Sequence, residues 1–188
     1  MEAEGYDREN LRLPECQNDL IFRLSKTGRD LVVVLQTGSA VEMPWVGEVD
    51  SILQMHLSGQ GAGKALAQVL TGKINPCGKL AETYPEKLSH TPAYLYRGSD
   101  ARVEYGESVF VGYRYYDKKD LNVLFPFGHG LSYTTFEYSD MTVERVEDEI
   151  HVSLTVTNTG SYEGSEVVQI YIGLNEKFAI QPVRKLAA

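Results

Sequence analysis

The run LVVVL at residues 31–35 limits the fold of this chain more than any other feature of its sequence. Five consecutive apolar residues, with valines at the centre, are typical of a strand that is buried on both faces. Strands of that kind belong to parallel sheets, where helices cover the two faces. Thr37, Gly38 and Ser39 follow the run and predict where the strand ends. The run therefore favours a layered α/β fold.

Helix and strand patterns alternate on both sides of this run. Apolar residues at helical spacing predict a helix between Pro14, which suits a first helical turn, and Gly28, which ends it. Residues 52–57 predict a second strand, and a glycine-rich turn separates this strand from a helix predicted over residues 64–70. The order helix, strand, short helix or turn, strand, helix is that of an α/β layered domain.

The remainder of the chain shows two further patterns. Residues 71–133 are rich in proline, glycine and aromatic residues, which predicts a segment that packs along the domain surface rather than a flexible linker. From Phe136 onward three segments alternate apolar and polar residues and predict strands of a β-sandwich: FEYSDMTVERV, EIHVSLTVTNTG and SEVVQIYIGL. A complete sandwich of this kind has about seven strands. We therefore expect an unfinished sandwich and a truncated chain.

The charge, the length of the apolar runs and the spacing of cysteine and histidine limit the kinds of partner that this chain can bind. The formal net charge is −8 and no segment collects lysine or arginine, whereas nucleic acids and anionic membranes require a basic face. No apolar run approaches the roughly 20 residues of a membrane span. Cys16, Cys77 and the histidines lack the spacing of a metal site. We expect no nucleic acid, membrane or metal partner.

The first ten residues, MEAEGYDREN, concentrate charged side chains around a glycine. A carboxylate beside Gly5 sits on a backbone that is free to bend into a cleft, and Asp7 and Arg8 could pair and hold that bend. A general acid needs a position that is reachable and partly desolvated. From these residues alone, a catalytic loop and an ordinary charged terminus both remain open.

Several segments, taken in order, resemble one known family. They are EGYDR followed by LRLP, VVVLQTGSAVEMPW, ILQMHLSGQGAGKALAQVLTGKINPCGKL, ESVFVGYRYYD, FPFGHGLSYTTFEY and VTNTGSYEGSEVVQIYI. In this combination they resemble the C-terminal portion of glycoside hydrolase family 3, the β-glucosidase family. The resemblance implies a barrel, an α/β sandwich and a fibronectin type III-like domain in the parent. Residues 1–135 would be the later part of the α/β sandwich, and residues 136–188 a partial fibronectin type III-like domain.

The same resemblance implies a retaining mechanism with two carboxyl groups and no metal or organic cofactor. The nucleophile is an aspartate of the barrel, which no residue here matches. The acid/base glutamate directly precedes Gly-x-Asp-Arg, a position that Glu4 occupies. Asp7 and Arg8 are then expected to shape the loop as an internal pair, with Glu2 as a bystander. Glu107, in the ESVFVGYRYYD segment, is the rival acid/base position.

The resemblance also implies the reaction of the parent: hydrolysis of terminal, non-reducing β-D-glucosyl residues of a β-glucoside or oligosaccharide substrate. The VEMPW segment favours a glucosidase over relatives that act on xylosides and other sugars. We expect this chain alone to be inactive because it lacks one carboxyl of the pair. Two alternatives remain open: a non-catalytic module that binds carbohydrate or protein, and a gene fragment without independent function.

Three smaller expectations complete the sequence reading. The turn at residues 58–61 reads Ser-Gly-Gln-Gly where the family pattern is Pro-Gly-Gln-Glu, which predicts a looser turn. The absence of an Asn-x-Ser/Thr site favours the cytoplasm over secretion. The motifs indicate no particular oligomeric state.

Overall fold

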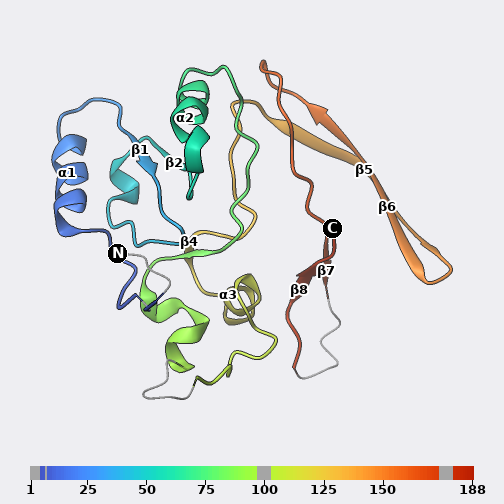
Figure 1. Ribbon diagram of the computed structural model, residues 1–188. Helices are drawn as coiled ribbons and strands as arrows, with labels where there is room; N and C mark the ends of the chain where they lie inside the picture. The colour runs from blue at the N-terminus through green and yellow to red at the C-terminus, as the bar shows by residue number, and fades with distance from the viewer. Residues whose placement is uncertain (1–4, 7, 97–102, 174–179) are drawn as a thin grey trace. The chain divides into compact units, whose positions relative to one another are not determined.

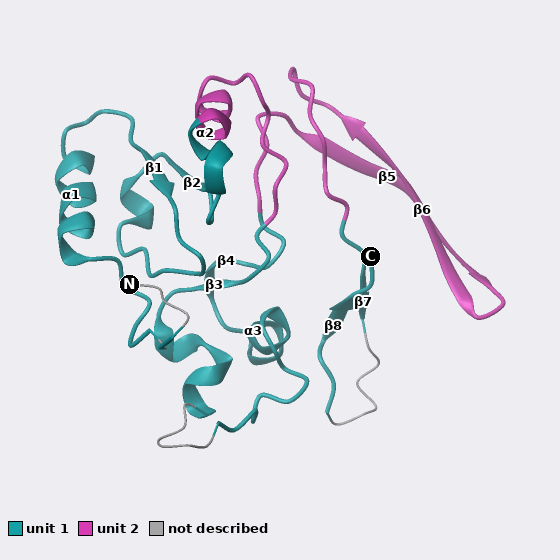
Figure 2. Cartoon of the chain, in the orientation of Figure 1, with its two compact units in different colours: residues 1–63, 80–129, 169–188 teal, residues 64–79, 130–168 magenta. Residues whose placement is uncertain are grey.

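The computed structural model describes residues 5–6, 8–96, 103–173 and 180–188 (Figure 1). The chain divides into two compact units (Figure 2). Unit 1 comprises residues 1–63, 80–129 and 169–188, and unit 2 comprises residues 64–79 and 130–168. No helix in the described part of the chain is long and apolar enough to cross a membrane.

Unit 1 begins with the alternation that the sequence predicts. Helix α1 (Glu15–Ser25) is followed by strand β1 (Val32–Leu35), a short 3-10 helix η1 (Val46–Glu48) and strand β2 (Ser51–Gln54). The two strands pair in parallel, with Val33 opposite Ile52. The second strand ends three residues earlier than predicted, because His56 adopts a φ of 50° that turns the chain out of the extended conformation.

The core of unit 1 lies on one face of β1. Val33 and Leu35 are 8% and 5% exposed, whereas Val32 is 48% exposed. The prediction that this strand is buried on both faces is therefore wrong for the described residues. Physically, the buried neighbours gather on the Val33 and Leu35 side; they are Ile21, Ala40, Val41, Met43, Trp45 and Tyr84.

The aromatic segment between residues 71 and 133 is ordered where it is described. It contributes strand β3 (Tyr84–Pro85), the 3-10 helices η3 (Leu88–His90) and η4 (Pro92–Tyr96), helix α3 (Tyr113–Lys119) and strand β4 (Val123–Phe125). Strands β3 and β4 pair in an antiparallel arrangement. Tyr84 and Tyr116 are 1% and 6% exposed. The described part of residues 80–129 thus packs into unit 1, and α3 is a helix that the sequence reading did not predict.

The last part of unit 1 departs from the predicted sandwich. Among the described residues of the segment SEVVQIYIGL, Tyr171–Gly173 forms a strand, β7. It pairs in an antiparallel arrangement with β8 (Arg184–Leu186) and not with the two long strands that precede it in sequence. The predicted third strand is therefore present only as three described residues, and its place in a sandwich stays a prediction. The pairing with β8 occupies one edge of β7.

Unit 2 contains most of helix α2 (Ala62–Leu70), which follows the 3-10 turn η2 (Gly59–Gly61) of unit 1, and a long hairpin. The hairpin consists of β5 (Phe136–Val146) and β6 (Glu149–Asn158), paired with a bulge between Ser139 and Thr142. On β6, Val152 and Leu154 are half-buried while Ser153 is exposed, as the alternating pattern predicts. The fibronectin type III-like identity of residues 136–188 and the boundary at residue 135 stay predictions.

Candidate functional site

The predicted catalytic loop is described only in part. Glu4 and Asp7 lie outside the described residues, as does Glu2. Arg8 is described, and its guanidinium donates a hydrogen bond to the backbone carbonyl of Ala40 at 3.0 Å. This bond links the chain just after the predicted loop to a residue that is 5% exposed. The expected pairing of Arg8 with Asp7 stays a prediction.

The residues after Arg8 are tied to the same segment of unit 1. The amide of Glu42 donates to the carbonyl of Leu11 at 2.7 Å, and Arg12 and Glu42 form a parallel bridge. The Arg12 Nε atom lies 3.5 Å from the Glu42 carboxylate. Asn10 accepts a hydrogen bond from the Arg12 amide through its side chain at 2.9 Å. Leu11 is 8% exposed, so this stretch of backbone is anchored in the core.

The segment that receives these bonds contains some of the most buried side chains of unit 1. Val41 and Met43 are each 2% exposed, and Trp45 is fully buried. The indole Nε1 of Trp45 donates to the side-chain oxygen of Asn18 on α1 at 2.8 Å, so the buried ring leaves no donor unsatisfied. The VEMPW segment is therefore a buried support for the residues that follow the predicted loop.

Glu107, the rival position, sits in a turn. The carbonyl of Glu107 accepts a hydrogen bond from the Phe110 amide at 2.9 Å, and Ser108 has a φ of 51°. A Cβ atom on the preceding Gly106 would lie 2.1 Å from the ring of Tyr96, so only glycine fits beside that ring. The turn geometry explains the local sequence without assigning chemistry to the Glu107 carboxylate.

Two segments that carried the resemblance, NPCGKL and FPFGHGLSYT, lie against each other. In unit 1, the amide of Leu80 donates to the carbonyl of His129, and the amide of Gly128 donates to the carbonyl of Leu80, both at 2.8 Å. In unit 2, the Lys79 ammonium donates to the carbonyl of Gly130 at 2.7 Å. A Cβ atom on Gly130 would approach the carbonyl oxygen of Gly78 to 2.2 Å. The two motifs therefore contact each other through hydrogen bonds and close backbone approach. The sequence alone does not reveal this structural role.

The GYRYYD motif forms an aromatic cluster in unit 1. The ring of Tyr113 stacks on Phe127 at a centroid distance of 4.9 Å and meets Tyr171 edge-on at 5.8 Å. The Arg114 guanidinium lies 5.9 Å from the Tyr113 ring centre, in agreement with a structural stacking role. The Tyr113 hydroxyl accepts a hydrogen bond from the Leu186 amide at 2.8 Å. The motif thus joins α3 to β8.

Charge pairing completes this cluster. The guanidinium of Arg184 lies 4.9 Å from the Tyr171 ring centre and bonds to the Asp117 carboxylate at 2.7 Å. The hydrogen bond to Asp117 raises the pKa of Arg184. Burial raises the pKa of Tyr171, although the positive charge of Arg184 opposes that shift. The charged and aromatic groups of the cluster contact one another. We therefore assign the cluster a structural role.

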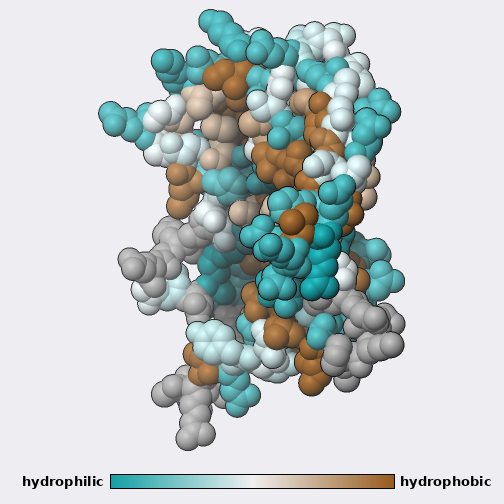
Figure 3. Space-filling model, turned by 90° about the vertical axis from the view of Figure 1, so that its right-hand side faces the viewer, coloured by the Kyte–Doolittle hydropathy of each residue, from teal (hydrophilic) through white to brown (hydrophobic). Residues whose placement is uncertain are grey.

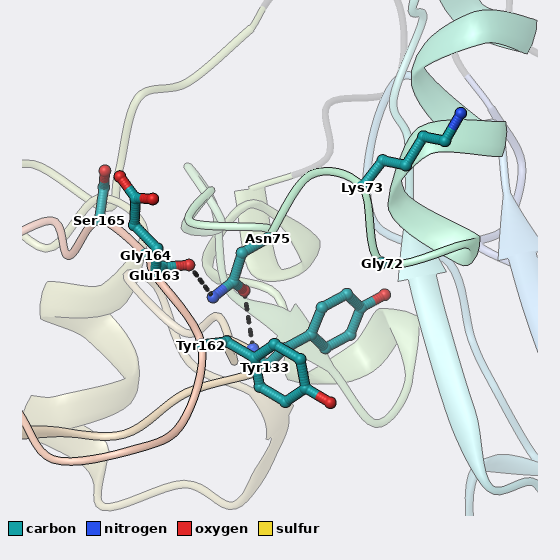
Figure 4. A pocket seen from close by; sticks show the side chains of 8 residues that line it. All are labelled: Gly72, Lys73, Asn75, Tyr133, Tyr162, Glu163, Gly164 and Ser165. Carbon is teal, nitrogen blue, oxygen red and sulfur yellow. Dashed lines mark hydrogen bonds between the residues drawn. The ribbon is translucent and has the colours of Figure 1, made fainter.

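Unit 2 contains a surface hollow of about 380 Å³ (Figure 4). Its lining residues are Gly72, Lys73, Asn75, Tyr133, Tyr162, Glu163, Gly164 and Ser165. The sequence reading did not identify this hollow, because its walls come from segments almost ninety residues apart. Tyr133 and Tyr162 were the signal in the sequence that could have indicated a binding surface. Among the described residues, no group of three or more histidine, cysteine, aspartate or glutamate side chains could hold a metal ion.

A comparison with protein families identifies the family of this chain. The sequence profile of the glycosyl hydrolase family 3 C-terminal domain matches residues 1–133. The chain belongs to glycosyl hydrolase family 3. The sequence-based recognition of the family is confirmed, and so is an α/β character for the part that the profile matches.

The relatives are named as β-glucosidases. Thermostable beta-glucosidase B of Acetivibrio thermocellus is 55% identical over 176 residues, which cover 91% of this chain and 23% of the relative. The crystal structure of a beta-glucosidase from Kluyveromyces marxianus superposes with a TM-score of 0.95 at 43% identity, covering 100% of this chain and 23% of that chain. The structure of beta-glucosidase 3B from Thermotoga neapolitana in complex with glucose superposes with a TM-score of 0.92 at 38% identity. The match covers 98% of this chain and 28% of that chain. The chain therefore spans less than a third of the length of these relatives.

Proposed function

We propose that this chain supplies the acid/base carboxyl, Glu4, of a retaining β-glucosidase whose nucleophile lies on a part of the enzyme outside these residues. Family membership and the β-glucosidase names of the relatives support the reaction class. The sequence Glu4-Gly-Tyr-Asp-Arg supports the residue, since the glutamate of this motif is the acid/base group in the family that the chain resembles. The parent would remove terminal, non-reducing β-D-glucosyl residues from a β-glucoside or oligosaccharide.

Glu4 has two roles in the proposed reaction. In the first step the nucleophile attacks the anomeric carbon, and Glu4 gives its proton to the departing glycosidic oxygen. In the second step the Glu4 carboxylate takes a proton from water, which attacks the glycosyl-enzyme and releases glucose with retained configuration. Neither step requires a metal or an organic cofactor.

The observation that carries this proposal is the hydrogen bond from Arg8 to the Ala40 carbonyl at 3.0 Å. An acid/base group must be held close to its productive geometry, and this is easier where the supporting residues are fixed by packing. Arg8 is four residues from Glu4, and the segment that it binds is among the most buried in unit 1. Arg8, at the end of the proposed loop, is thus tied to a buried segment, which supports the proposal.

The domain assignment belongs to the same proposal. Residues 1–135 would be a part of the α/β sandwich, and residues 136–188 a part of a fibronectin type III-like domain. The family profile ends at residue 133, and β5 begins at Phe136, which supports a boundary between them.

The proposal is tested with a hybrid enzyme. The matching segment of the Acetivibrio thermocellus β-glucosidase is replaced by this chain, which is 55% identical to it. We expect Glu4→Gln in the hybrid to lower kcat/KM about 10²–10⁴-fold for a substrate with a poor leaving group, since general acid catalysis contributes that much. The loss should be much smaller for a dinitrophenyl glucoside, whose leaving group needs no proton.

Two matched variants control this experiment. Glu2→Gln removes a neighbouring carboxyl and Glu107→Gln removes the rival, and both should keep kcat/KM within a few-fold of the unmutated hybrid. A Glu4→Gln hybrid with full activity, or a Glu107→Gln hybrid with the leaving-group dependence described above, would contradict the assignment. The isolated chain should not turn over an aryl β-glucoside, because it lacks the second carboxyl.

A further inference from the structure

Two exposed tyrosine rings border the hollow of unit 2. Tyr133 is 46% exposed and Tyr162 is 62% exposed. Figure 4 shows both rings among the side chains that line the hollow, with the Asn75 side chain bonded to the Tyr133 amide. The Tyr133 hydroxyl donates to the Val69 carbonyl at the end of α2 at 3.0 Å, which fixes that ring in place. The Tyr133 ring is therefore oriented before any ligand binds, and Tyr162 adds a second, more exposed ring.

The floor of the hollow is a rigid hydrogen-bonded frame. Asn75 accepts from the Ser132 hydroxyl and the Tyr133 amide, both at 2.8 Å, and donates to the Glu163 carbonyl at 3.0 Å. A Cβ atom on Gly164 would lie 2.7 Å from the Asn75 amide nitrogen, so the backbone approaches this side chain closely. The three bonds use both ends of the Asn75 amide and hold the two walls at a fixed spacing.

The rim carries hydrogen-bonding groups of both kinds. The Lys73 ammonium and the Glu163 carboxylate point away from the tyrosine rings (Figure 4), and Ser165 adds a hydroxyl. A hydroxyl both donates and accepts a hydrogen bond. The two charged groups have opposite signs, so the rim does not select an anion or a cation. A volume of about 380 Å³ suits a small molecule.

A pyranose ring fits this set of groups. It presents a face of C–H groups that packs on an aromatic ring and a rim of hydroxyls that both donate and accept. We propose that the hollow formed by Asn75, Tyr133, Tyr162 and Ser165 is a binding site for a neutral saccharide, with one sugar ring stacked on Tyr162. The site goes beyond the proposed function, because it lies in unit 2 and uses none of the residues proposed for catalysis.

The test is a titration of the full 188-residue chain with cellobiose, followed by amide NMR. We expect saturable shifts at Gly72, Gly164 and Ser165, with a Kd on the order of 1 mM. Sorbitol is the control titrant: it carries hydroxyls like those of glucose but has no pyranose face. It should produce no saturable shift at these residues.

Variants identify the ring that binds. Tyr162→Ala should raise the Kd for cellobiose about tenfold, since an aromatic contact of this size is worth about one decade in affinity. The fold should survive, because the described hydrogen bond of Tyr162 is accepted by its backbone carbonyl, from Asn158. Tyr105→Ala is the matched control: Tyr105 is 82% exposed, lies in unit 1 and also accepts a hydrogen bond through its carbonyl.

The result separates this site from the catalytic proposal. Glu4→Gln should bind cellobiose like the unmutated chain, so a failure of the Glu4 assignment would leave the saccharide site intact. The absence of saturable shifts with cellobiose would overturn the inference, as would an unchanged Kd in Tyr162→Ala. Binding of a proline-rich peptide in place of cellobiose would assign the tyrosines to peptide recognition and would also overturn it.

Discussion

The two units of this chain are held together by different interactions. In unit 1, apolar side chains such as Val41, Met43 and Trp45 are at most 2% exposed and form a continuous core. In unit 2 the one buried residue is Thr134, which is 8% exposed and whose hydroxyl donates to the Asn158 side chain at 2.7 Å. Hydrophobic residues of the hairpin remain exposed, including Val143 and Ile150 at 59% each. Figure 3 shows hydrophobic side chains at the surface of the chain.

This difference shows that a strand pattern specifies a strand without specifying its burial. β1 and β6 were both predicted from apolar residues, but only β1 belongs to the apolar core. In unit 2 the segments are joined by polar contacts, such as the ion pair between Lys79 and Glu166 at 2.9 Å and the three bonds of Asn75. A two-stranded hairpin is only marginally stable by itself. We therefore expect unit 1 to depend on apolar burial and unit 2 on hydrogen bonds.

The largest expected effect comes from truncating the core of unit 1. Trp45→Ala should lower the free energy of unfolding by about 3–5 kcal/mol, since it removes a fully buried ring and leaves a cavity. Val143→Ala on the exposed face of the hairpin should change it by less than about 0.5 kcal/mol. Urea unfolding followed by circular dichroism measures both. Equal midpoints for the two variants would contradict the comparison.

A second test uses a titratable ring in unit 1. Burial, followed by the nearby Tyr115 and Glu82, raises the pKa of Tyr116 to about 12 from 10.0. The folded state keeps the proton that the unfolded chain loses above pH 10, so this contribution to stability is present below pH 10 and disappears as the pH rises to about 12. The loss is about 3 kcal/mol at most. Tyr116→Phe should flatten this part of the stability profile, and an unchanged profile would show that the ring is not buried.

A third test removes the central side chain of unit 2. Asn75→Ala should lower stability by about 2 kcal/mol, because the Tyr133 amide and the Glu163 carbonyl lose their partner. Amide hydrogen exchange should increase on β5 and β6 more than on β1. Asn122→Ala, at an exposed position, is the matched control and should leave exchange unchanged. Faster exchange on β1 alone would contradict a polar frame for unit 2.

The smallest expected effect concerns Arg8, at the end of the proposed catalytic loop. Arg8→Met keeps the aliphatic stem but removes the charged donor to the Ala40 carbonyl, which should cost about 1.5 kcal/mol. Arg12→Met is the control: the Arg12 side chain is 74% exposed and its ion pair with Glu42 is 3.5 Å long, so a loss below about 1 kcal/mol is expected. Thermal unfolding of the two variants gives both values. A larger loss of stability in Arg12→Met than in Arg8→Met would contradict the assignment of Arg8 as the anchoring residue.

The sequence predicted the elements whose apolar spacing is local. α1, β1, β2 and α2 follow from runs and helical periods, and the hairpin follows from alternation. It did not predict α3, because Tyr113–Lys119 consists of aromatic and charged residues without a helical stripe. The helix is instead supported by contacts of Tyr113 with Phe127 and Tyr171, which are distant in sequence.

The candidate sites divide in the same way. Glu4 was proposed from a short motif that can be recognised in the letters alone. The bond between Arg8 and the Ala40 carbonyl has no such signal, since every residue carries a carbonyl. The hollow around Asn75 joins segments 88 residues apart, and their meeting depends on tertiary structure. A short motif can therefore suggest a catalytic residue from the sequence, and Glu4 stays a prediction, whereas the long-range contacts around Arg8 and Asn75 could not be predicted.

The central claim, that Glu4 is the acid/base group, is tested most directly by azide rescue of the Glu4→Gln hybrid enzyme with dinitrophenyl β-glucoside. The activated leaving group departs without a proton, and the glycosyl-enzyme then accumulates because no base activates water. Azide needs no base: it attacks the anomeric carbon and releases the nucleophile carboxylate. Our account predicts turnover that rises with azide concentration and gives β-glucosyl azide. A Glu4→Gln hybrid that azide does not accelerate, together with a Glu107→Gln hybrid that it does, would contradict the account.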